Sequence, residues 1–435
     1  MNLLSLRDQA AIWHPFTQHY ISPTQLPFVK GEGAYLFDQE GKRYLDLISS
    51  WWVNIHGHAN PVIAKAIYEQ ALQLEHVVFA GFTHEPAIAL GEQLLKLLPG
   101  FGKVFYSDNG STSIEVAIKM AYQYWQNRGE KKSRFLAFEG GYHGDTMGSM
   151  SLGRSSHYFR VFEDLLFSVD IAPFPATWQE DGNIFEKEHQ ALATIENYFK
   201  NYCKELAAII IEPLIQGASG MRICRSEFLR GLESLAKQYG VLVIYDEVMT
   251  GFGRTGELFA CKKAGTQPDI ICLAKGITGG FLPLAVTICQ EYIYQGFLSN
   301  NIQQALTHGH SYTANPLGCA AGLASLQLLL KPETDKKIKT IANVHTAGLL
   351  SLKKIPIVEK IRQCGTIAAF DIATPISYGS AESQRIREQF LEYGLLIRPL
   401  GNVIYLLPPY CTEIADLESA YKAITEILTQ SLEAA

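Results

Sequence analysis

The chain has 435 residues, of which 47% are hydrophobic and 18% charged, and its formal net charge is −6. A chain of this length can bury a large core and usually divides into two domains. The modest, dispersed charge forms no basic stripe, which excludes a typical nucleic-acid-binding protein and favours small-molecule chemistry.

Cysteine and histidine spacing indicates neither disulfides nor a metal site. The eight cysteines form no C-x-x-C pair, and no histidines lie at zinc-binding spacing. We therefore expect no metal and a reduced, cytoplasmic protein. The N-terminus lacks the pattern of a signal peptide. The most apolar helical stretch, 317–330, is shorter than a membrane span, so we expect a buried helix and no membrane contact.

The first sixty residues contain many aromatic residues and turns, which predicts short strands packed on a larger body. Trp51 and Trp52 are adjacent, and neighbouring residues of a strand face opposite sides. We expect one tryptophan in the core and the other at a site or an interface. The alternative is that both are ordinary core residues.

Helices are predicted at 60–74, where Asn60 is a capping residue, and at 86–98. A strand at 103–107 is then followed by a turn of small residues that opens a helix at 111–127. Such a turn presents free N–H groups and the positive end of the helix dipole, which favour a phosphate. Gly110 and Ser111 are therefore phosphate candidates, and an ordinary Ser/Thr N-cap is the alternative.

Two further segments end in candidate site residues. A strand at 134–138 leads into the glycine-rich loop GGYHGDTMGSM, where Tyr142 could stack on a planar cofactor or be an ordinary surface tyrosine. A strand at 207–211 ends at Glu212, for which we expect a supporting role.

The central stretch, 241–280, contains two apolar runs that each end in a charged residue, Asp246 and Lys275. Such runs predict buried parallel strands, whose carboxyl ends are where open α/β sheets bind ligands. A desolvated lysine tends to lose its proton, and a neutral amine can condense with an aldehyde. This pattern indicates pyridoxal 5'-phosphate, whose ring nitrogen needs an acidic partner. A simple Asp–Lys ion pair is the alternative.

The same stretch contains Gly251, Gly253 and Gly256 in the spacing G-x-G-x-x-G. A dinucleotide site would require a helix at once and an acidic residue about 20 positions later. Neither pattern follows, so we interpret these glycines as a turn near the cofactor.

The last 105 residues alternate between short strands and helices, which predicts a small α+β domain joined by the N-terminal segment. The expected parts are 1–60 (N-terminal part of the small domain), 61–329 (large cofactor-binding domain) and 330–435 (C-terminal part of the small domain). Arg398 lies at the end of a strand predicted at 395–398, where its guanidinium could bind a carboxylate or be merely structural. The other predicted elements are strands at 366–372 and 403–407 and helices at 382–393 and 413–432.

Three motifs, DEVMTGFGRTG, PDIICLAKGITGG and HGHSYTANPLGCAAG, resemble those of the class III aminotransferases. The resemblance implies a fold-type I transferase in which Asp246 holds the pyridine nitrogen of pyridoxal phosphate, Lys275 carries the cofactor and Tyr142 lies against its ring. It also implies that Gly309, His310 and Ser311 reach the cofactor phosphate of a neighbouring subunit, in a homodimer with shared sites.

Three other motifs, IWHPFTQ, SSWWVNIHGHANP and IRPLGNVIYLLPPY, resemble the branch of this family that converts 8-amino-7-oxononanoate into 7,8-diaminononanoate in biotin biosynthesis. This resemblance implies that Phe16 and Trp51 line the substrate pocket and that Arg398 binds the substrate carboxylate. S-adenosylmethionine is the favoured amino donor. Lysine is the alternative, because Phe16 stands where tyrosine is common and His310-Ser311 where proline-threonine is common.

The alternatives for function are an aminotransferase for ornithine or another ω-amine, a pyridoxal-dependent mutase or racemase, and a non-enzymatic cofactor-binding protein. The first would share every cofactor residue but would not need the paired tryptophans. The last would not need to retain both Lys275 and Asp246.

Overall fold

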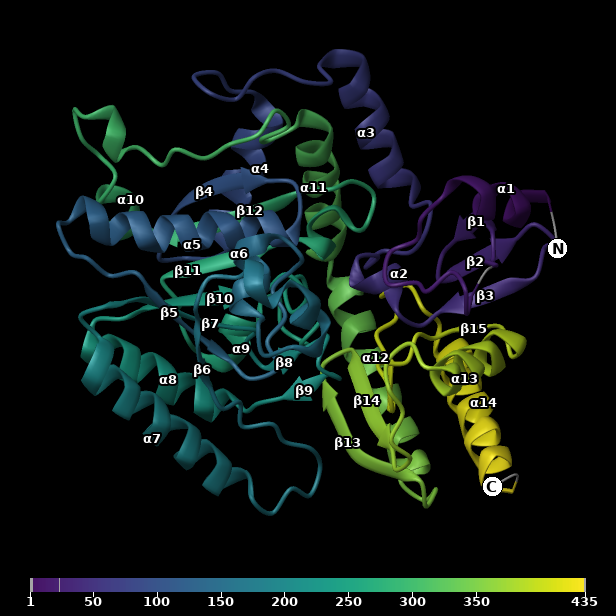
Figure 1. The fold of residues 1–435 in the computed structure, drawn as a ribbon. Helices are drawn as coiled ribbons and strands as arrows, with labels where there is room; N and C mark the ends of the chain where they lie inside the picture. Colours follow the sequence, from purple (N-terminus) through teal and green to yellow (C-terminus); the bar gives the residue numbers. More distant parts are fainter. Residues whose placement is uncertain (1–2, 23, 434–435) are drawn as a thin grey trace.

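In a computed structural model that describes residues 3–22 and 24–433, the chain is built around a seven-stranded sheet (Figure 1). All of its neighbouring strands pair in parallel except β12, which is antiparallel to both β11 and β4. The predicted mostly parallel α/β sheet is therefore confirmed. In spatial order the strands are β4 (Phe101–Ser107), β12 (Ala285–Gln290), β11 (Ile270–Leu273), β10 (Leu242–Asp246), β7 (Leu206–Ile211), β5 (Arg134–Phe138) and β6 (Asp170–Ala172).

Every residue of the central strands β7, β10 and β11 is buried, because helices cover both faces of the sheet. The side chains alternate between two core clusters. Ile209 and Val243 belong to the cluster that contains residues of α7 (Ile184–Tyr202) and α8 (Ser226–Tyr239). Ile210 and Ile244 belong to the cluster formed with α5 (Gly110–Asn127). This alternation explains why the strands appear as continuous apolar runs in the sequence.

The helices predicted at 60–74, 86–98 and 317–330 lie close to those positions. Asn60 caps the first of them by accepting a hydrogen bond from the backbone N–H of Val62, and His84 caps the second by accepting one from Ala87. The predicted buried helix is α11, and among the described residues no helix is long and apolar enough to cross a membrane. The other helices of this part of the chain, several of them not predicted, are α3 (Pro61–Gln73), α4 (Glu85–Leu97), α6 (Met147–Leu152), α9 (Ala260–Ala264), α10 (Glu291–Gln295) and α11 (Pro316–Leu329), with short 3-10 segments η1 (His157–Leu165), η2 (Lys275–Thr278) and η3 (Ile302–Gln304).

The remaining chain forms smaller sheets. Strand β15 pairs in parallel with β3, so segments from the two ends of the sequence share one sheet, and Figure 1 shows the N-terminal strands beside α13. The domain limits given above stay a prediction. The sheets are β1 (Phe28–Glu32), β2 (Tyr35–Asp38), β3 (Arg43–Asp46) and β15 (Leu395–Leu396); β13 (Val358–Cys364), β14 (Ile367–Ile372) and β16 (Val403–Leu406); and β8 (Ile215–Gln216) with β9 (Arg222–Ile223). Their helices are α1 (Leu3–Ala11), α12 (Pro332–Leu352), α13 (Ala381–Glu392) and α14 (Ile414–Glu433).

The strand predicted at 395–398 is wrong in its second half. Strand β15 ends at Leu396, so Arg398 lies in an irregular segment just before Pro399. Proline has no N–H to donate to a neighbouring strand, and it restricts the residue before it.

The tandem tryptophans do not lie in a strand. The four residues of α2 (Ser49–Trp52) all have positive φ, between 46° and 76°, and form a left-handed turn. Each such residue costs about 1–2 kcal/mol relative to a right-handed one, so the turn needs external support. Asp46 accepts hydrogen bonds from the Ile48 N–H (3.2 Å) and the Ser50 hydroxyl (2.8 Å), and Ser49 donates to the carbonyl of Leu407 (2.7 Å).

Candidate active site

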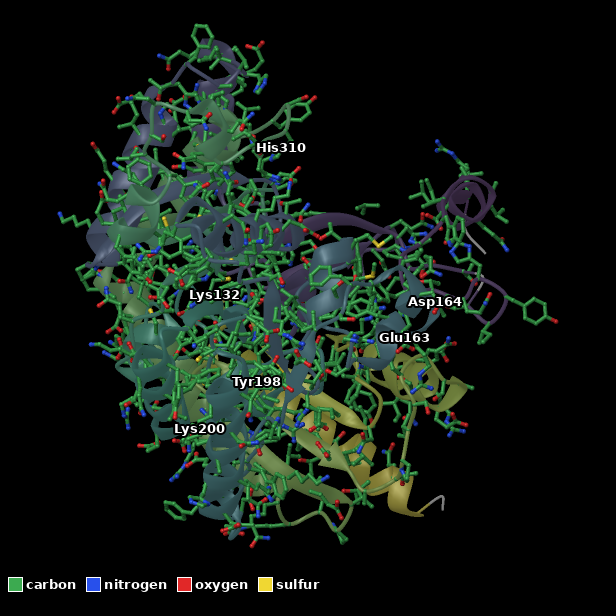
Figure 2. The ribbon with its side chains drawn as sticks, turned by 60° about the vertical axis from the view of Figure 1, so that its left-hand side comes forward. Lys132, Glu163, Asp164, Tyr198, Lys200 and His310 are labelled. Carbon is green, nitrogen blue, oxygen red and sulfur yellow. The ribbon has the colours of Figure 1, made fainter. Side chains whose placement is uncertain are left out.

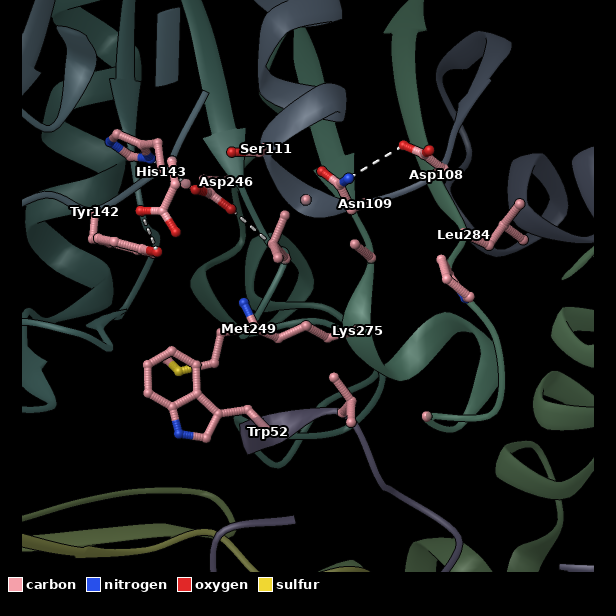
Figure 3. Close-up of a pocket in the computed structure, with 18 of the residues that line it drawn as sticks. Trp52, Asp108, Asn109, Ser111, Tyr142, His143, Asp246, Met249, Lys275 and Leu284 are labelled. Atoms are coloured by element: carbon pink, nitrogen blue, oxygen red, sulfur yellow. Dashed lines mark hydrogen bonds and ion pairs between the residues drawn. The ribbon is translucent and has the colours of Figure 1, made fainter. Parts of the chain in front are cut away.

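A cavity of about 690 Å³ lies at the carboxyl ends of β10 and β11, where Asp246 and Lys275 were predicted to meet. Figure 3 shows the Lys275 side chain extending into this cavity between Trp52 and Asp246. Every predicted cofactor residue except His310 and Ser311 lines it: Gly110, Ser111, Tyr142, Glu212, Asp246 and Lys275.

The Lys275 amine has no hydrogen bond or ion pair with any residue that the structure describes. The amine lies 5.2 Å from the centre of the Trp52 ring. Desolvation by the surrounding protein lowers the pKa of Lys275, although the carboxylates of Asp246 and Glu212 act in the opposite direction. The alternative of a direct Asp246–Lys275 ion pair is therefore wrong, and the amine is available for chemistry.

Each of the two carboxylate oxygens of Asp246 contacts a different group. Its Oδ2 atom lies 2.7 Å from Nδ1 of His143, and its Oδ1 accepts a hydrogen bond from the Val248 N–H at 3.1 Å. Both Asp246 and His143 are buried, so this carboxylate is fixed in one orientation. His143 lies in the glycine-rich loop, and no local pattern predicts its contact with Asp246, which is 103 residues away in the chain.

Glu212 also lies in the cavity wall and is buried. It accepts hydrogen bonds from the backbone N–H groups of Tyr142 and Gly217, both at 3.1 Å. Burial raises the pKa of Glu212 to about 7. Its carboxyl group connects two loops beside the cavity. The supporting role expected for Glu212 stays a prediction.

Tyr142 is half-buried and donates a hydrogen bond from its hydroxyl to Asp145 at 3.0 Å. Its ring is stacked on Phe159, with centroids 5.6 Å apart and an interplanar angle of 18°. The alternative of an ordinary surface tyrosine is therefore wrong. Asp145 lines the cavity as well, and it was not among the predicted site residues.

Helix α5 begins beside the cavity. Asn109 caps it by accepting a hydrogen bond from the Thr112 N–H at 3.0 Å, so Ser111 is not the N-cap. Gly110 and Ser111 thus occupy the first turn, whose N–H groups have no partners within the helix. At Gly110 a Cβ atom would meet Val248 at 2.7 Å, which explains the glycine. The geometry suits an anion such as a phosphate.

A second cavity, of about 500 Å³, shares Trp52, Tyr142 and Lys275 with the first and contains the predicted substrate residues Phe16, Trp51 and Arg398. Trp52 is buried and donates from its indole N–H to the Tyr405 hydroxyl at 3.1 Å, whereas Trp51 is 37% exposed. One tryptophan is therefore buried and the other exposed, and both side chains line this cavity; the assignment of Trp51 to the substrate site stays a prediction.

Arg398 in this cavity carries an unneutralised positive charge. Its guanidinium lies over the Trp51 ring at 4.6 Å and donates to the Tyr378 hydroxyl at 2.7 Å. It makes no ion pair with the described residues, which leaves it able to bind a carboxylate. Phe16 lies edge-on to Trp51, with ring centroids 5.7 Å apart. Tyr158 and Tyr378, which were not predicted, complete the aromatic wall.

Gly309, His310 and Ser311 line neither cavity of their own chain. They lie in the loop before α11, and Figure 2 shows His310 in the upper part of the molecule. Their predicted contact with the cofactor of a neighbouring subunit stays a prediction.

The glycines of the G-x-G-x-x-G spacing form a turn, as expected, with no helix directly after them. Gly253 and Gly256 both have φ of +96°, which a side chain would strain. The turn carries the buried Arg254, whose guanidinium donates to the backbone carbonyls of Trp52 (3.3 Å) and Pro408 (2.8 Å). The turn thereby helps to hold the tryptophan segment beside the cavity.

The parallel sheet, with an unpaired lysine and a fixed aspartate at its carboxyl edge, defines the class of protein. Residues 17–428 match the family described as Aminotransferase class-III, and the chain belongs to this family.

Curated relatives match over nearly the whole chain. The chain is 50% identical to the adenosylmethionine-8-amino-7-oxononanoate aminotransferase of Synechococcus elongatus over 96% of this chain and 98% of that protein. It is 39% identical to the protein of the same name from Staphylococcus aureus, over 93% and 92% of the two chains.

Solved structures that superpose on this chain are also aminotransferases. The crystal structure of adenosylmethionine-8-amino-7-oxononanoate aminotransferase from Methanocaldococcus jannaschii superposes with a TM-score of 0.91 at 36% identity, covering 98% of this chain and 99% of that one. An amine transaminase from an uncultivated Pseudomonas species, in its PLP-bound form, gives a TM-score of 0.89 at 29% identity, covering 96% and 98%. The predicted fold-type I architecture is confirmed.

Proposed function

We propose that this aminotransferase transfers an amino group to 8-amino-7-oxononanoate and so makes 7,8-diaminononanoate for biotin biosynthesis, with pyridoxal 5'-phosphate as cofactor and S-adenosylmethionine as donor. The observation that carries the chemistry is the unpaired amine of Lys275 in one cavity with the fixed carboxylate of Asp246. The relatives named above support the choice of substrates.

The residues present fit the cofactor. Lys275 would hold its aldehyde carbon, Asp246 its ring nitrogen, and the first turn of α5 at Gly110 and Ser111 its phosphate. Tyr142 would lie beside the ring. When bound, pyridoxal phosphate acts as an electron sink that stabilises negative charge at the substrate carbon.

The protein contributes proton transfer and electrostatics. The Lys275 amine, whose pKa desolvation lowers, would act as the base that takes the proton from the reacting carbon of the substrate and as the acid that gives it back. Asp246, oriented by His143, would favour the protonated form of the ring nitrogen. Glu212 stabilises the loop that carries Tyr142.

The second cavity supplies recognition of the substrate. Arg398 binds its carboxylate through charged hydrogen bonds, and Trp51 covers the apolar carbon chain. Phe16 adds an aromatic face on which an adenine ring could stack.

We further propose a cytoplasmic homodimer with shared active sites. Its support is the position of Gly309, His310 and Ser311 outside the cavities of their own chain, together with the exposure of the large apolar side chains of Phe82 and Tyr312. The eight unpaired cysteines fit a reducing compartment.

Product analysis tests the proposed function. The purified enzyme is incubated with 8-amino-7-oxononanoate and S-adenosylmethionine, and 7,8-diaminononanoate is measured by mass spectrometry. We expect product with the wild type and none with Lys275→Ala. An enzyme that instead aminates only short ω-oxo acids would contradict the assignment and favour another class III aminotransferase.

A further inference from the structure

A third cavity, of about 490 Å³, adjoins the substrate cavity on the side of Arg398. The two share Phe16, Tyr158, Tyr378 and Arg398, but only the inner one contains Lys275. The outer cavity contains a second arginine, Arg387, and among the described residues no aspartate or glutamate lines it. A substrate that extends from Lys275 past Arg398 would therefore enter a space with an excess of positive charge.

Arg387 lies on α13 and is half-buried. Its guanidinium has no hydrogen bond or ion pair with any residue that the structure describes. Burial lowers the pKa of its guanidinium and the nearby charge of Arg398 acts in the same direction, whereas the carboxylate of Glu388, which does not line the cavity, acts against them. Two partly desolvated cations that face one cavity repel each other, and an anion bound beside them would relieve that repulsion.

The two substrates of the proposed reaction place their carboxylates differently. In an α-amino-acid donor such as S-adenosylmethionine, the carboxylate is attached to the reacting carbon. In 8-amino-7-oxononanoate it lies at the far end of a long carbon chain. Because both reacting carbons must come to Lys275, one arginine cannot hold both carboxylates in the same place. A second anion position, farther from Lys275, is required.

We propose that Arg387 extends the carboxylate site of Arg398 into an outer subsite that anchors the long-chain acceptor, and that the donor does not use Arg387. Arg387 is then a residue that determines specificity for chain length. This inference rests on the proposed function for the identity of its substrates, whereas the subsite itself rests on the two arginines of the outer cavity.

The test compares the two half-reactions of the holoenzyme by their visible absorbance. The amine form is mixed with 8-amino-7-oxononanoate, and the aldehyde form with the donor that converts the wild type. Arg387→Gln should raise the half-saturating concentration of the acceptor by about tenfold, as expected for loss of a charged hydrogen bond, and leave that of the donor unchanged. Arg387→Lys, which keeps the charge, should recover part of the loss.

The matched control is Arg385→Gln, since Arg385 lies on the same helix but is exposed. It should change neither half-reaction. Equal losses in both half-reactions, or no loss in either, with Arg387→Gln would overturn the inference.

Inhibition by simple acids separates this inference from the proposed function. Nonanoate should inhibit the donor half-reaction of the wild type more strongly than that of Arg387→Gln, whereas acetate should inhibit both equally. If the wild type fails to convert the acceptor but nonanoate still distinguishes the two proteins, the proposed function falls and the subsite stands. Equal inhibition of both proteins by nonanoate would exclude the subsite.

Discussion

The Nδ1 atom of His143 lies 2.7 Å from Oδ2 of Asp246, and both side chains are buried at the edge of the central sheet. This contact leaves the aspartate with one defined orientation, while its other oxygen is held by the Val248 N–H. A carboxylate fixed in this way can stabilise a protonated ring nitrogen without reorganising during the reaction.

Replacing Asp246 by asparagine should therefore retain cofactor but lose most activity. A neutral amide cannot keep the ring nitrogen protonated, and electrostatic contributions of this kind are worth about 10²-fold or more. Single-turnover rates measured by stopped-flow absorbance would give the size of the loss. A rate near that of the wild type would show that Asp246 has no electronic role.

Arg398→Ala should weaken binding of carboxylate-bearing substrates. The loss of a charged hydrogen-bonded pair costs about 1.5–3 kcal/mol, which corresponds to roughly ten- to a hundredfold in affinity. The KM for each substrate measures this effect. Unchanged KM values for both substrates would place Arg398 outside the binding site.

Glu212 should make the folded protein less stable as the pH rises. Burial raises its pKa from 4.5 to about 7, so between these values the unfolded chain releases a proton that the folded chain keeps. The free energy of unfolding therefore falls from pH 4.5 to pH 7, by about 3 kcal/mol for this group.

Urea unfolding at pH 5 and pH 7.5 measures this fall. The decrease in the free energy of unfolding should be smaller for Glu212→Gln than for the wild type. Glu247, whose pKa burial also raises to about 7, contributes equally to both proteins. Identical decreases would show that Glu212 is ionised in the folded state.

The donor is tested by a half-reaction. S-adenosylmethionine is favoured because Phe16, Trp51 and Tyr158 form an aromatic wall beside Arg398. The aldehyde-form enzyme should lose its visible absorbance when it is mixed with S-adenosylmethionine and not with lysine. Conversion with lysine alone would show that lysine is the amino donor. The assignment of 8-amino-7-oxononanoate as the acceptor would not be affected.

Much of the fold could be predicted because its signals are local. The apolar runs that end at Asp246 and Lys275 are strands buried on both faces, and Asn60 caps a helix at its predicted start. Helix α12 (Pro332–Leu352) and the antiparallel strand β12 (Ala285–Gln290) have no counterpart among the predicted elements. The pairing direction of β12 depends on partners distant in the chain.

The candidate site was predicted less completely because several of its features arise only through long-range contacts. The left-handed turn at Ser49–Trp52 contains no glycine, and non-glycine residues rarely adopt this conformation, so propensity could not predict it. Asp145 and Arg387 can be recognised as candidate site residues only because they line the cavities of the folded chain. Trp51 and Arg398 were identified through motifs whose residues the fold brings together.

The central claim is that Lys275 is the amine that holds the cofactor, and borohydride reduction followed by peptide mapping tests it most directly. The wild-type holoenzyme should give one reduced adduct, on the peptide that contains Lys275. The Lys275→Ala variant should give no adduct and no turnover, because no other lysine lines the cavity within the described residues. An adduct that persisted in the variant and mapped to a different lysine would contradict the account.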